Sequence, residues 1–168
     1  TGTFLGFQHD GVRPDAVSLA KGLAGGVPIG AMLCRKELAE ALPPGSHGST
    51  FGGNPLASAA ALAVLDVLEK EQLLEAVKTR GAELTGRLDA LGVKYPKLVA
   101  TTRGRGLLQA LVLKDDVDAR AVMSRLQDAG VLVTIAGGQA LRITPPLNIT
   151  SAELGAALDV LDKVLGSL

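Results

Sequence analysis

The sequence predicts a mixed α/β fold in which the first part of the chain adds strands to a larger sheet. Three observations support this: short apolar runs bounded by Gly or Pro within residues 16–34, two long helical patterns between 55 and 92, and alternating strand and helix patterns over 93–168. With 168 residues, the chain can form one small domain and part of another. We therefore predict the end of a larger domain over 1–68, an inter-domain helix over 69–92 and a small α+β domain over 93–168.

Composition argues against several classes of partner. The chain has 17 basic and 17 acidic residues, so it has no net charge to attract nucleic acid or an anionic membrane surface. No apolar run reaches the roughly 20 residues that a membrane helix needs. His9 and His47 lie in separate polar loops without metal-ligand spacing, so we expect no metal site. The single Cys34 lies in the apolar run AMLC, which predicts a buried thiol and a reducing, cytoplasmic location.

The first third of the chain alternates apolar runs with flexible segments. Residues 16–20 and 29–34 are short, apolar and bounded by Gly or Pro, so we predict two buried strands that flank a glycine turn. Residues 41–55 are rich in Gly, Pro, Ser and Thr, which is typical of a loop. Asn54 followed by Pro55 is a helix start, and residues 56–68 are apolar on nearly every side, which predicts a helix buried on most sides.

An amphipathic helix is predicted over 71–92, with Gly92 as its stop, and it forms a bridge with the helix before it. Its apolar face repeats every three or four residues, at Leu73, Leu74, Val77, Gly81, Leu84, Leu88 and Leu91.

The last part of the chain carries clear helix caps. We interpret RGRG at 103–106 as a basic turn before a strand at 106–114. Asp118 then caps a helix that ends at Gly130. Strands at 131–135 and 140–144 are joined by the tight connection AGGQ. Thr150 and Glu153 form a capping box for a final helix, which is predicted to bury Leu154, Ala157, Leu158, Leu161 and Leu165.

Two loops contain candidate catalytic and cofactor-binding residues. Lys21 stands in SLAKGLAGG, where small neighbours leave room for a flat ring, and lysine is the side chain that forms a Schiff base with a carbonyl cofactor. The loop GSHGSTFGGNP offers the hydroxyls of Ser49 and Thr50 together with mobile glycine amides, a combination that suits a phosphate group. The ordinary alternatives are a solvated turn lysine and a flexible connector that caps the next helix.

Arg142 is the third candidate. It alternates with Leu141 and Ile143 on a predicted strand, so it points to the opposite face, and two prolines define the strand's exit. A guanidinium held in this way can bind a carboxylate through two parallel hydrogen bonds. The ordinary alternative is an edge-strand arginine in solvent.

Four segments together carry a family resemblance: PDAVSLAKGLAGGVPIGAM, PGSHGSTFGGNPLASAA, RGRGLL and LRITPPLNIT, in this order along the whole chain. The sequence resembles the C-terminal part of a class III (ornithine-type) pyridoxal-phosphate aminotransferase of fold type I, most closely the members that act on N-acetylornithine. The resemblance implies the end of the large-domain sheet, the linking helices and a small α+β C-terminal domain.

The resemblance also implies roles for single residues. Lys21 matches the lysine that holds pyridoxal 5′-phosphate covalently and later moves a proton between the substrate Cα and the cofactor. Thr50, beside Ser49, matches the hydroxyl that serves the cofactor phosphate of a neighbouring subunit, which implies a homodimer. Arg142 matches the arginine that binds a substrate carboxylate. The implied reaction, in arginine biosynthesis, passes the amino group of N-acetylornithine to the cofactor and then to 2-oxoglutarate, giving glutamate.

The sequence departs from the family pattern in two ways. Ala24 stands where the family has another glycine, which adds only a methyl group. The family's acidic partner of the pyridine nitrogen, its glycine-rich phosphate loop and its ring-stacking aromatic residue would all precede Thr1, and the chain lacks an initial Met. We interpret the sequence as a chain entered in the middle, and we do not expect these 168 residues alone to be fully active.

Two alternatives stay open at this point. Another class III substrate, namely ornithine, succinylornithine or 4-aminobutyrate, fits the same motifs. A non-catalytic C-terminal module for subunit association is the alternative from a different functional class.

Overall fold

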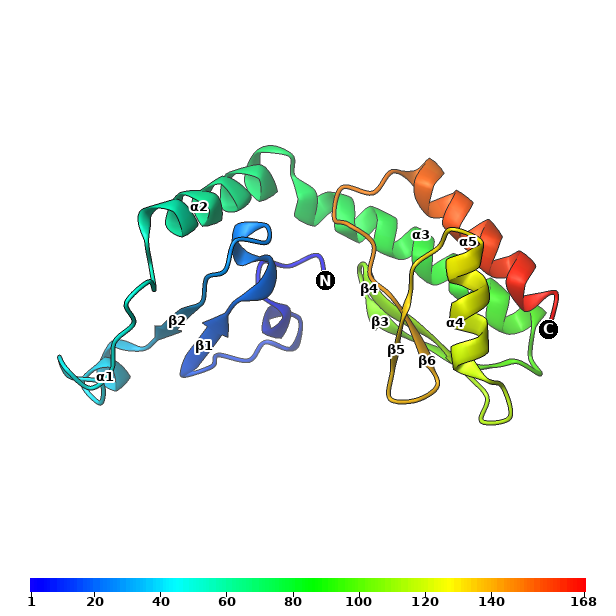
Figure 1. The fold of residues 1–168 in the computed structure, drawn as a ribbon, viewed down its shortest axis with the longest axis horizontal. Coiled ribbons are helices and arrows are strands. Elements are labelled where there is room, and N and C mark those ends of the chain that lie inside the picture. Colours follow the sequence, from blue (N-terminus) through cyan, green and yellow to red (C-terminus); the bar gives the residue numbers. More distant parts are fainter. The chain divides into compact units, whose positions relative to one another are not determined.

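The computed structural model describes residues 1–168, which divide into two compact units (Figure 1). The hairpin unit comprises Leu5–Gln72, and the sheet unit comprises Thr1–Phe4 together with Leu73–Leu168. None of the helices combines the length and the apolar character needed to cross a bilayer.

The hairpin unit is built around two short antiparallel strands and one long helix. Strands β1 (Ala16–Leu19) and β2 (Ala31–Cys34) pair with Ala16 opposite Cys34. The helix α2 (Pro55–Lys70) packs on the short 3₁₀ helix η2 (Lys21–Ala24), and the small side chains of Ala24, Ala57 and Ala61 are buried in this unit. The 3₁₀ helix η1 (Gly6–Asp10) and the short α1 (Lys36–Ala39) complete it.

The helix α2 begins where Asn54 and Pro55 predict a helix start, so that prediction is confirmed. The Asn54 side chain accepts a hydrogen bond from the Ala57 backbone N–H at 3.0 Å, and Pro55 occupies the first helical turn. The proline ring is tolerated there because the first turn of a helix has no internal partner for its N–H groups.

Burial in the hairpin unit differs from the prediction. Both strands form at the predicted places, but β2 is exposed along its whole length, so the prediction of two buried strands was wrong. Cys34 is an exposed free thiol, not a buried one. The helix α2 leaves Leu56 74% and Leu62 64% exposed. The reason is that this unit supplies η2 as a packing partner for one face of α2 and no second layer for the others.

The sheet unit has a four-stranded antiparallel sheet in the order β3-β4-β6-β5 (Figure 1). The strands are β3 (Val99–Arg105), β4 (Leu108–Leu113), β5 (Thr134–Ala136) and β6 (Ala140–Ile143). The helices α3 (Leu73–Lys94), α4 (Ala119–Asp128) and α5 (Ser151–Leu165) share one core with the sheet. Leu111 of β4 and Leu141 of β6 are fully buried in that core, and so is Leu88 of α3.

Two boundaries in the sheet unit differ from the prediction. Gly92 does not stop α3, which continues to Lys94. The helix ends because Pro96 disfavours helical backbone at the residue before it. The segment RGRG is not a turn before a strand: Arg103–Arg105 lies within β3, and the turn is at 106–107. Since β3 is an edge strand with mostly exposed side chains, its sequence shows no apolar alternation.

A buried glutamine joins the β3–β4 hairpin to α3. Gln109 is 4% exposed, and its Nε2 lies 2.9 Å from the Gly81 carbonyl oxygen and 2.7 Å from that of Gly106. A Cβ added to Gly81 would lie 2.5 Å from the Gly106 Cα, so this close approach of helix to turn requires glycine. The contact holds the hairpin that carries Arg103 in a defined position.

Candidate active site

Lys21 occupies the first position of η2, and one residue, Ala20, separates it from β1. Its backbone has φ of 55°, in the left-handed region, which costs a non-glycine residue about 1–2 kcal/mol. The side chain is exposed and makes no hydrogen bond or ion pair within the chain. A Cβ added at Gly22 or at Gly26 would meet no atom within 4 Å. Lys21 therefore stands at a strained backbone position next to glycines whose side-chain positions are open, which suits attachment to a planar aldehyde.

The hydroxyl loop, residues 48–53, lies between α1 and α2 and is exposed throughout. Ser49 Oγ accepts a hydrogen bond from the Gly52 N–H at 2.9 Å. A Cβ at Gly52 would lie 2.8 Å from that same Oγ, so the turn needs glycine there. The Thr50 hydroxyl makes no hydrogen bond within the chain and is available to a ligand. These hydroxyl groups just before the start of α2 are the chemistry that a phosphate group requires.

Arg142 lies on β6, exposed, with Ala110 of β4 on one side and Thr134 of β5 on the other. Its Nε donates a hydrogen bond to Thr134 Oγ1 at 3.0 Å, which leaves the two terminal nitrogens of the guanidinium for an external acceptor. The predicted alternation is confirmed, because Leu141 is fully buried on the other face of the same strand. The guanidinium can therefore bind a carboxylate with both terminal nitrogens.

The candidate residues are distributed over the two units. Lys21, Ser49 and Thr50 belong to the hairpin unit, whereas Arg142 belongs to the sheet unit. No hydrogen bond or ion pair joins Lys21 to Ser49 or Thr50. The lysine amine and the Thr50 hydroxyl have no partner within the chain. An amine can react with the aldehyde of pyridoxal 5′-phosphate, and a hydroxyl can donate a hydrogen bond to its phosphate.

Sequence reasoning missed two residues beside Arg142. Thr134 holds Nε of the arginine, and Arg103 lines the same depression of about 460 Å³ on the sheet surface. The signal for Thr134 lay within the predicted strand VLVTI, where it alternates with apolar residues. The sequence around Arg103 shows no apolar alternation that would indicate a strand, because β3 ends with two arginines and a glycine.

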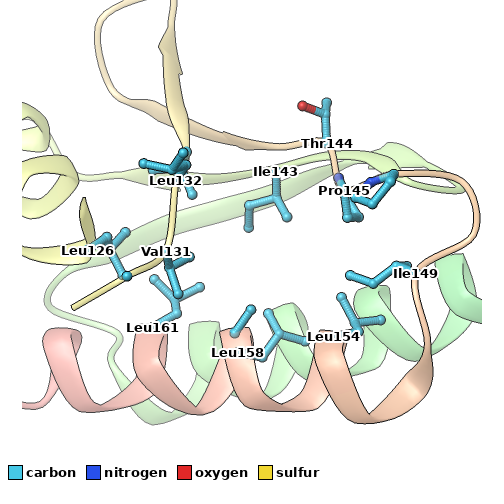
Figure 2. Close-up of a pocket in the computed structure, with 14 residues that line it drawn as sticks. Leu126, Val131, Leu132, Ile143, Thr144, Pro145, Ile149, Leu154, Leu158 and Leu161 are labelled. Atoms are coloured by element: carbon cyan, nitrogen blue, oxygen red, sulfur yellow. The ribbon is translucent and has the colours of Figure 1, made fainter. Parts of the chain in front are cut away.

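A second cavity, of about 290 Å³, has a different character (Figure 2). It lies beside α5 and is lined by apolar side chains that include Leu126, Ile143, Leu158 and Leu161. Its lining holds no ionisable side chain. It therefore offers no group for acid–base chemistry or for binding a carboxylate.

The chain matches a family of aminotransferases and curated members of it. The family model described as "Aminotransferase class-III" matches residues 1–165. Acetylornithine aminotransferase of Gloeobacter violaceus is 47% identical over 168 residues, which is 100% of this chain and 42% of that protein. Acetylornithine aminotransferase of Mycobacterium tuberculosis is 47% identical over 171 residues, covering 99% of this chain and 42% of its own length. The chain thus spans less than half the length of these curated relatives.

Solved structures agree in fold. The crystal structure of acetylornithine aminotransferase from Elizabethkingia anophelis matches 100% of this chain and 43% of its own, with a TM-score of 0.93 and 35% identity. Ornithine δ-aminotransferase of Plasmodium falciparum matches 99% of this chain and 44% of its own, with a TM-score of 0.93 and 36% identity. The fold is that of the C-terminal portion of a fold type I pyridoxal-phosphate transferase. Since a family model and whole-chain matches agree, this chain belongs to the class-III aminotransferases, a family of enzymes that use pyridoxal 5′-phosphate.

Proposed function

We propose that the protein transfers the amino group of N-acetylornithine to 2-oxoglutarate, giving glutamate and a semialdehyde in arginine biosynthesis. The observation that carries this proposal is Lys21, an exposed lysine with left-handed backbone among glycines. Backbone strain of this kind concentrates at functional sites. The substrate is supported by curated relatives that are named acetylornithine aminotransferases.

Lys21 performs the central chemistry in this proposal. When bound, pyridoxal 5′-phosphate supplies an aldehyde and an electron-withdrawing ring. The Lys21 amine would hold the cofactor covalently, and it would move a proton to and from the substrate Cα. The open space at Gly22 and Gly26 lets the amine approach a flat ring without a steric clash.

Ser49 and Thr50 bind the cofactor phosphate. The Thr50 hydroxyl has no partner within the chain and donates a hydrogen bond to a phosphate oxygen. The turn at Gly52 fixes Ser49 beside it. Following the family pattern, we assign these hydroxyls to the cofactor of a neighbouring subunit, so the working unit is a homodimer with its sites at the interface.

An exposed, unpaired Cys34 is compatible with a reducing cytoplasm as the location of the protein.

Arg142 binds a substrate carboxylate. Thr134 holds the Nε of Arg142, so the plane of the guanidinium is oriented before the substrate arrives. The terminal nitrogens then make two parallel hydrogen bonds to one carboxylate. A carboxylate is present in the amino donor and in 2-oxoglutarate, so one arginine serves both half-reactions.

Other ω-amino donors are alternatives within the same reaction. Solved relatives from Plasmodium falciparum and Toxoplasma gondii are named ornithine aminotransferases. Succinylornithine and 4-aminobutyrate fit the same motifs. Comparing kcat/KM of the full-length protein for N-acetylornithine with kcat/KM for these three donors separates the candidates, and a preference for N-acetylornithine supports the proposal.

A non-catalytic association module is the second candidate function. The exposed apolar side chains of α2, Leu56 and Leu62, favour association with another protein surface. This candidate predicts that no cofactor becomes attached to the full-length protein, so the experiment on Lys21 decides between the two.

The experiment labels the cofactor lysine in the full-length protein. The protein is incubated with pyridoxal 5′-phosphate, reduced with borohydride, digested and examined by peptide mass spectrometry. We expect the label on Lys21 and its loss in Lys21→Ala. Lys36→Ala is the matched control, because Lys36 is also an exposed lysine of the hairpin unit without an ion pair, and it should keep the label. A label on another lysine, with Lys21 unmodified, would falsify the assignment.

A further inference from the structure

The hydrogen bond that orients Arg142 comes from the shortest strand of the sheet unit. Strand β5 has three residues, lies at the edge of the sheet and pairs with β6 alone (Figure 1). Strands in globular proteins are usually five or six residues long, and an edge strand has no second neighbour to hold it. The position of Thr134, the first residue of β5, therefore depends on features outside that strand.

The hydrogen bond between Thr134 and Arg142 requires the observed register of β5 and β6. In the structure, Thr134 is opposite Arg142 and Ile135 is opposite Leu141. Leu141 is fully buried in the core and Ile135 packs against the same core, so Thr134 and Arg142 point to the other face of the sheet. A slip of β5 by one residue would turn Thr134 towards the core face and break its 3.0 Å hydrogen bond with Arg142 Nε.

The turn that joins β5 to β6, residues 137–139, contributes little rigidity of its own. It contains Gly137 and Gly138, which have φ of 57° and 85°, and a Cβ added to either would meet no atom within 4 Å. Glycine gives the backbone its largest conformational freedom, and register is weakly specified in glycine-rich strands and turns. A contact from outside the turn can therefore determine where the turn lies.

Gln139, the last residue of this turn, supplies such a contact. Its Nε2 donates hydrogen bonds to the carbonyl oxygens of Lys114 at 2.6 Å and of Val117 at 3.0 Å, both in the segment between β4 and α4. Its own carbonyl oxygen accepts a hydrogen bond from the Leu113 N–H, at the end of β4, at 2.9 Å. Because three hydrogen bonds from one residue join the turn to its surroundings, Gln139 fixes the point at which β6 begins.

A turn displaced by one residue would lose the side-chain contacts of Gln139. The last position of the displaced turn would be occupied by Gly138 or Ala140, and neither residue has a side-chain donor. Gln139 therefore stabilises the one register that places Thr134 opposite Arg142.

We propose that Gln139 and Thr134 act in series as positioning residues for carboxylate binding by Arg142. Gln139 holds the register of the β5–β6 hairpin, and this register places the Thr134 hydroxyl beside Arg142 Nε. The two terminal nitrogens of Arg142 then remain available to a carboxylate. The inference rests on the proposed function, in which Arg142 binds a substrate carboxylate, and it adds Gln139, which acts without a hydrogen bond to the arginine.

The test measures binding of glutarate, an unreactive carboxylate, to the full-length protein by calorimetry. Thr134→Val replaces the hydroxyl with a methyl group of similar size, and Gln139→Met keeps the length of the side chain but removes its N–H donors. Each change should weaken glutarate binding about three- to tenfold, because one orienting hydrogen bond is lost. Thr134→Ser restores the hydroxyl and should bring the affinity back to within about twofold of the unaltered protein.

Matched controls come from the same unit. Thr101→Val makes the same change on β3, the other edge strand, where the hydroxyl bonds only to the Thr102 carbonyl oxygen at 3.2 Å. Gln127→Met makes the same change on α4, at an exposed glutamine whose side chain makes no hydrogen bond within the chain. Neither control should alter the affinity for glutarate by more than about twofold.

A double variant distinguishes action in series from two separate effects. If Gln139 acts through Thr134, Gln139→Met should weaken binding little further when it is combined with Thr134→Val, whereas independent effects would multiply. A loss equal to the product of the two single losses would overturn the inference. Unchanged glutarate binding in either single variant, or binding by Thr134→Ser as weak as that of Thr134→Val, would also overturn it.

A second substitution keeps the test decisive if Gln139→Met does not fold. Gln139→Asn keeps the carboxamide but shortens the side chain by one methylene group, so its donors no longer reach both carbonyl oxygens. It should weaken glutarate binding in the same way, and unchanged binding in this variant would contradict the positioning role of Gln139.

Failure of this inference is distinguishable from failure of the proposed function. Arg142→Ala should abolish glutarate binding if Arg142 binds a carboxylate, and borohydride labelling of Lys21 reports the cofactor site independently. Lost binding in Arg142→Ala together with unchanged binding in Thr134→Val removes only the positioning residues. Unchanged binding in Arg142→Ala removes the carboxylate role of Arg142 and, with it, this inference.

Discussion

Arg142 shows how one hydrogen bond selects which atoms of a side chain remain available. Thr134 accepts from Nε, so the outer edge of the guanidinium, with its two terminal nitrogens, is presented to solvent. A lysine at this position would keep the charge but would have no planar edge to match a carboxylate.

Arg142→Lys should lower kcat/KM for both substrates of the full-length enzyme by about tenfold to a hundredfold, since at least one charge-assisted hydrogen bond is lost. The absorbance spectrum of the bound cofactor should stay close to that of the unaltered protein. Steady-state kinetics with 2-oxoglutarate and with the amino donor check the first point. Unchanged kinetics, or a protein that no longer folds, would assign Arg142 a structural role.

At the scale of the element, two helices of the sheet unit, α4 and α5, begin with side-chain caps. The Asp118 carboxylate accepts hydrogen bonds from two backbone N–H groups at the start of α4, at 2.9 and 3.1 Å. At the start of α5, Thr150 Oγ1 accepts from the Glu153 N–H at 3.2 Å, while the Glu153 carboxylate accepts from the Thr150 N–H at 2.9 Å. These caps satisfy donors that a helix leaves unpaired, so they define where α4 and α5 begin.

Thr150→Ala removes half of the α5 capping box and should destabilise the start of that helix by about 0.5–2 kcal/mol. Hydrogen exchange in the full-length protein, followed over residues 151–155, should become correspondingly faster. Thr79→Ala on α3 is a control, because the Thr79 hydroxyl bonds only to a backbone oxygen of its own helix, Glu75, at 3.3 Å. Unaltered exchange in Thr150→Ala would contradict a capping role.

The same box makes α5 sensitive to acid. Hydrogen bonds from the backbone N–H and the hydroxyl of Thr150 lower the pKa of Glu153 from its ordinary value of 4.5. Because the folded pKa is lowered, this stabilisation is complete above pH 4.5 and is lost as pH falls through the folded pKa. The protection of the amides at the start of α5, relative to the intrinsic exchange rate at each pH, should therefore fall in that acidic range. Glu153→Gln should reduce this pH dependence to the part contributed by Glu83, which accepts a hydrogen bond from Ser151 Oγ at 2.7 Å and also has a lowered pKa. An undiminished pH dependence in Glu153→Gln would assign it to Glu83 alone.

For the whole molecule, the proposed assembly is a two-fold dimer in which the hydroxyl loop of one subunit serves the cofactor of the other. Closed two-fold pairs are the commonest assembly of soluble proteins. In such a dimer each site takes Lys21 from one subunit and Thr50 from its partner.

Mixing Lys21→Ala with Thr50→Ala subunits of the full-length protein should restore activity. In a mixed dimer one site carries both substitutions and the other carries neither, so random pairing should restore about a quarter of the original activity. Sedimentation should also give a dimer. If the hydroxyl loop served its own subunit, every site of the mixed dimer would carry one substitution and no activity would return. An active monomer would also contradict the assembly.

The starts of α2, α4 and α5 were predictable from the sequence because their causes are local. Asn54, Asp118 and Thr150 each bond to backbone within three residues, so neighbours in the chain are sufficient to identify them. Neighbouring residues also indicate the glycine-flanked turn at Lys21. They indicate the exposure of Arg142 as well, because side chains alternate between the two faces of a strand. The roles of Lys21, Ser49, Thr50 and Arg142 came from the family resemblance and remain predictions.

Only the tertiary structure decided which residues are buried and which strands are neighbours. Cys34 and α2 have apolar surroundings in the sequence, but burial depends on whether another layer covers them, and the hairpin unit has none. Arg103 and Arg142 are 39 residues apart in the chain and share one row because β4 lies between β3 and β6. That neighbourhood follows from strand order and register, which depend on packing against the shared core and not on the residues next to either arginine.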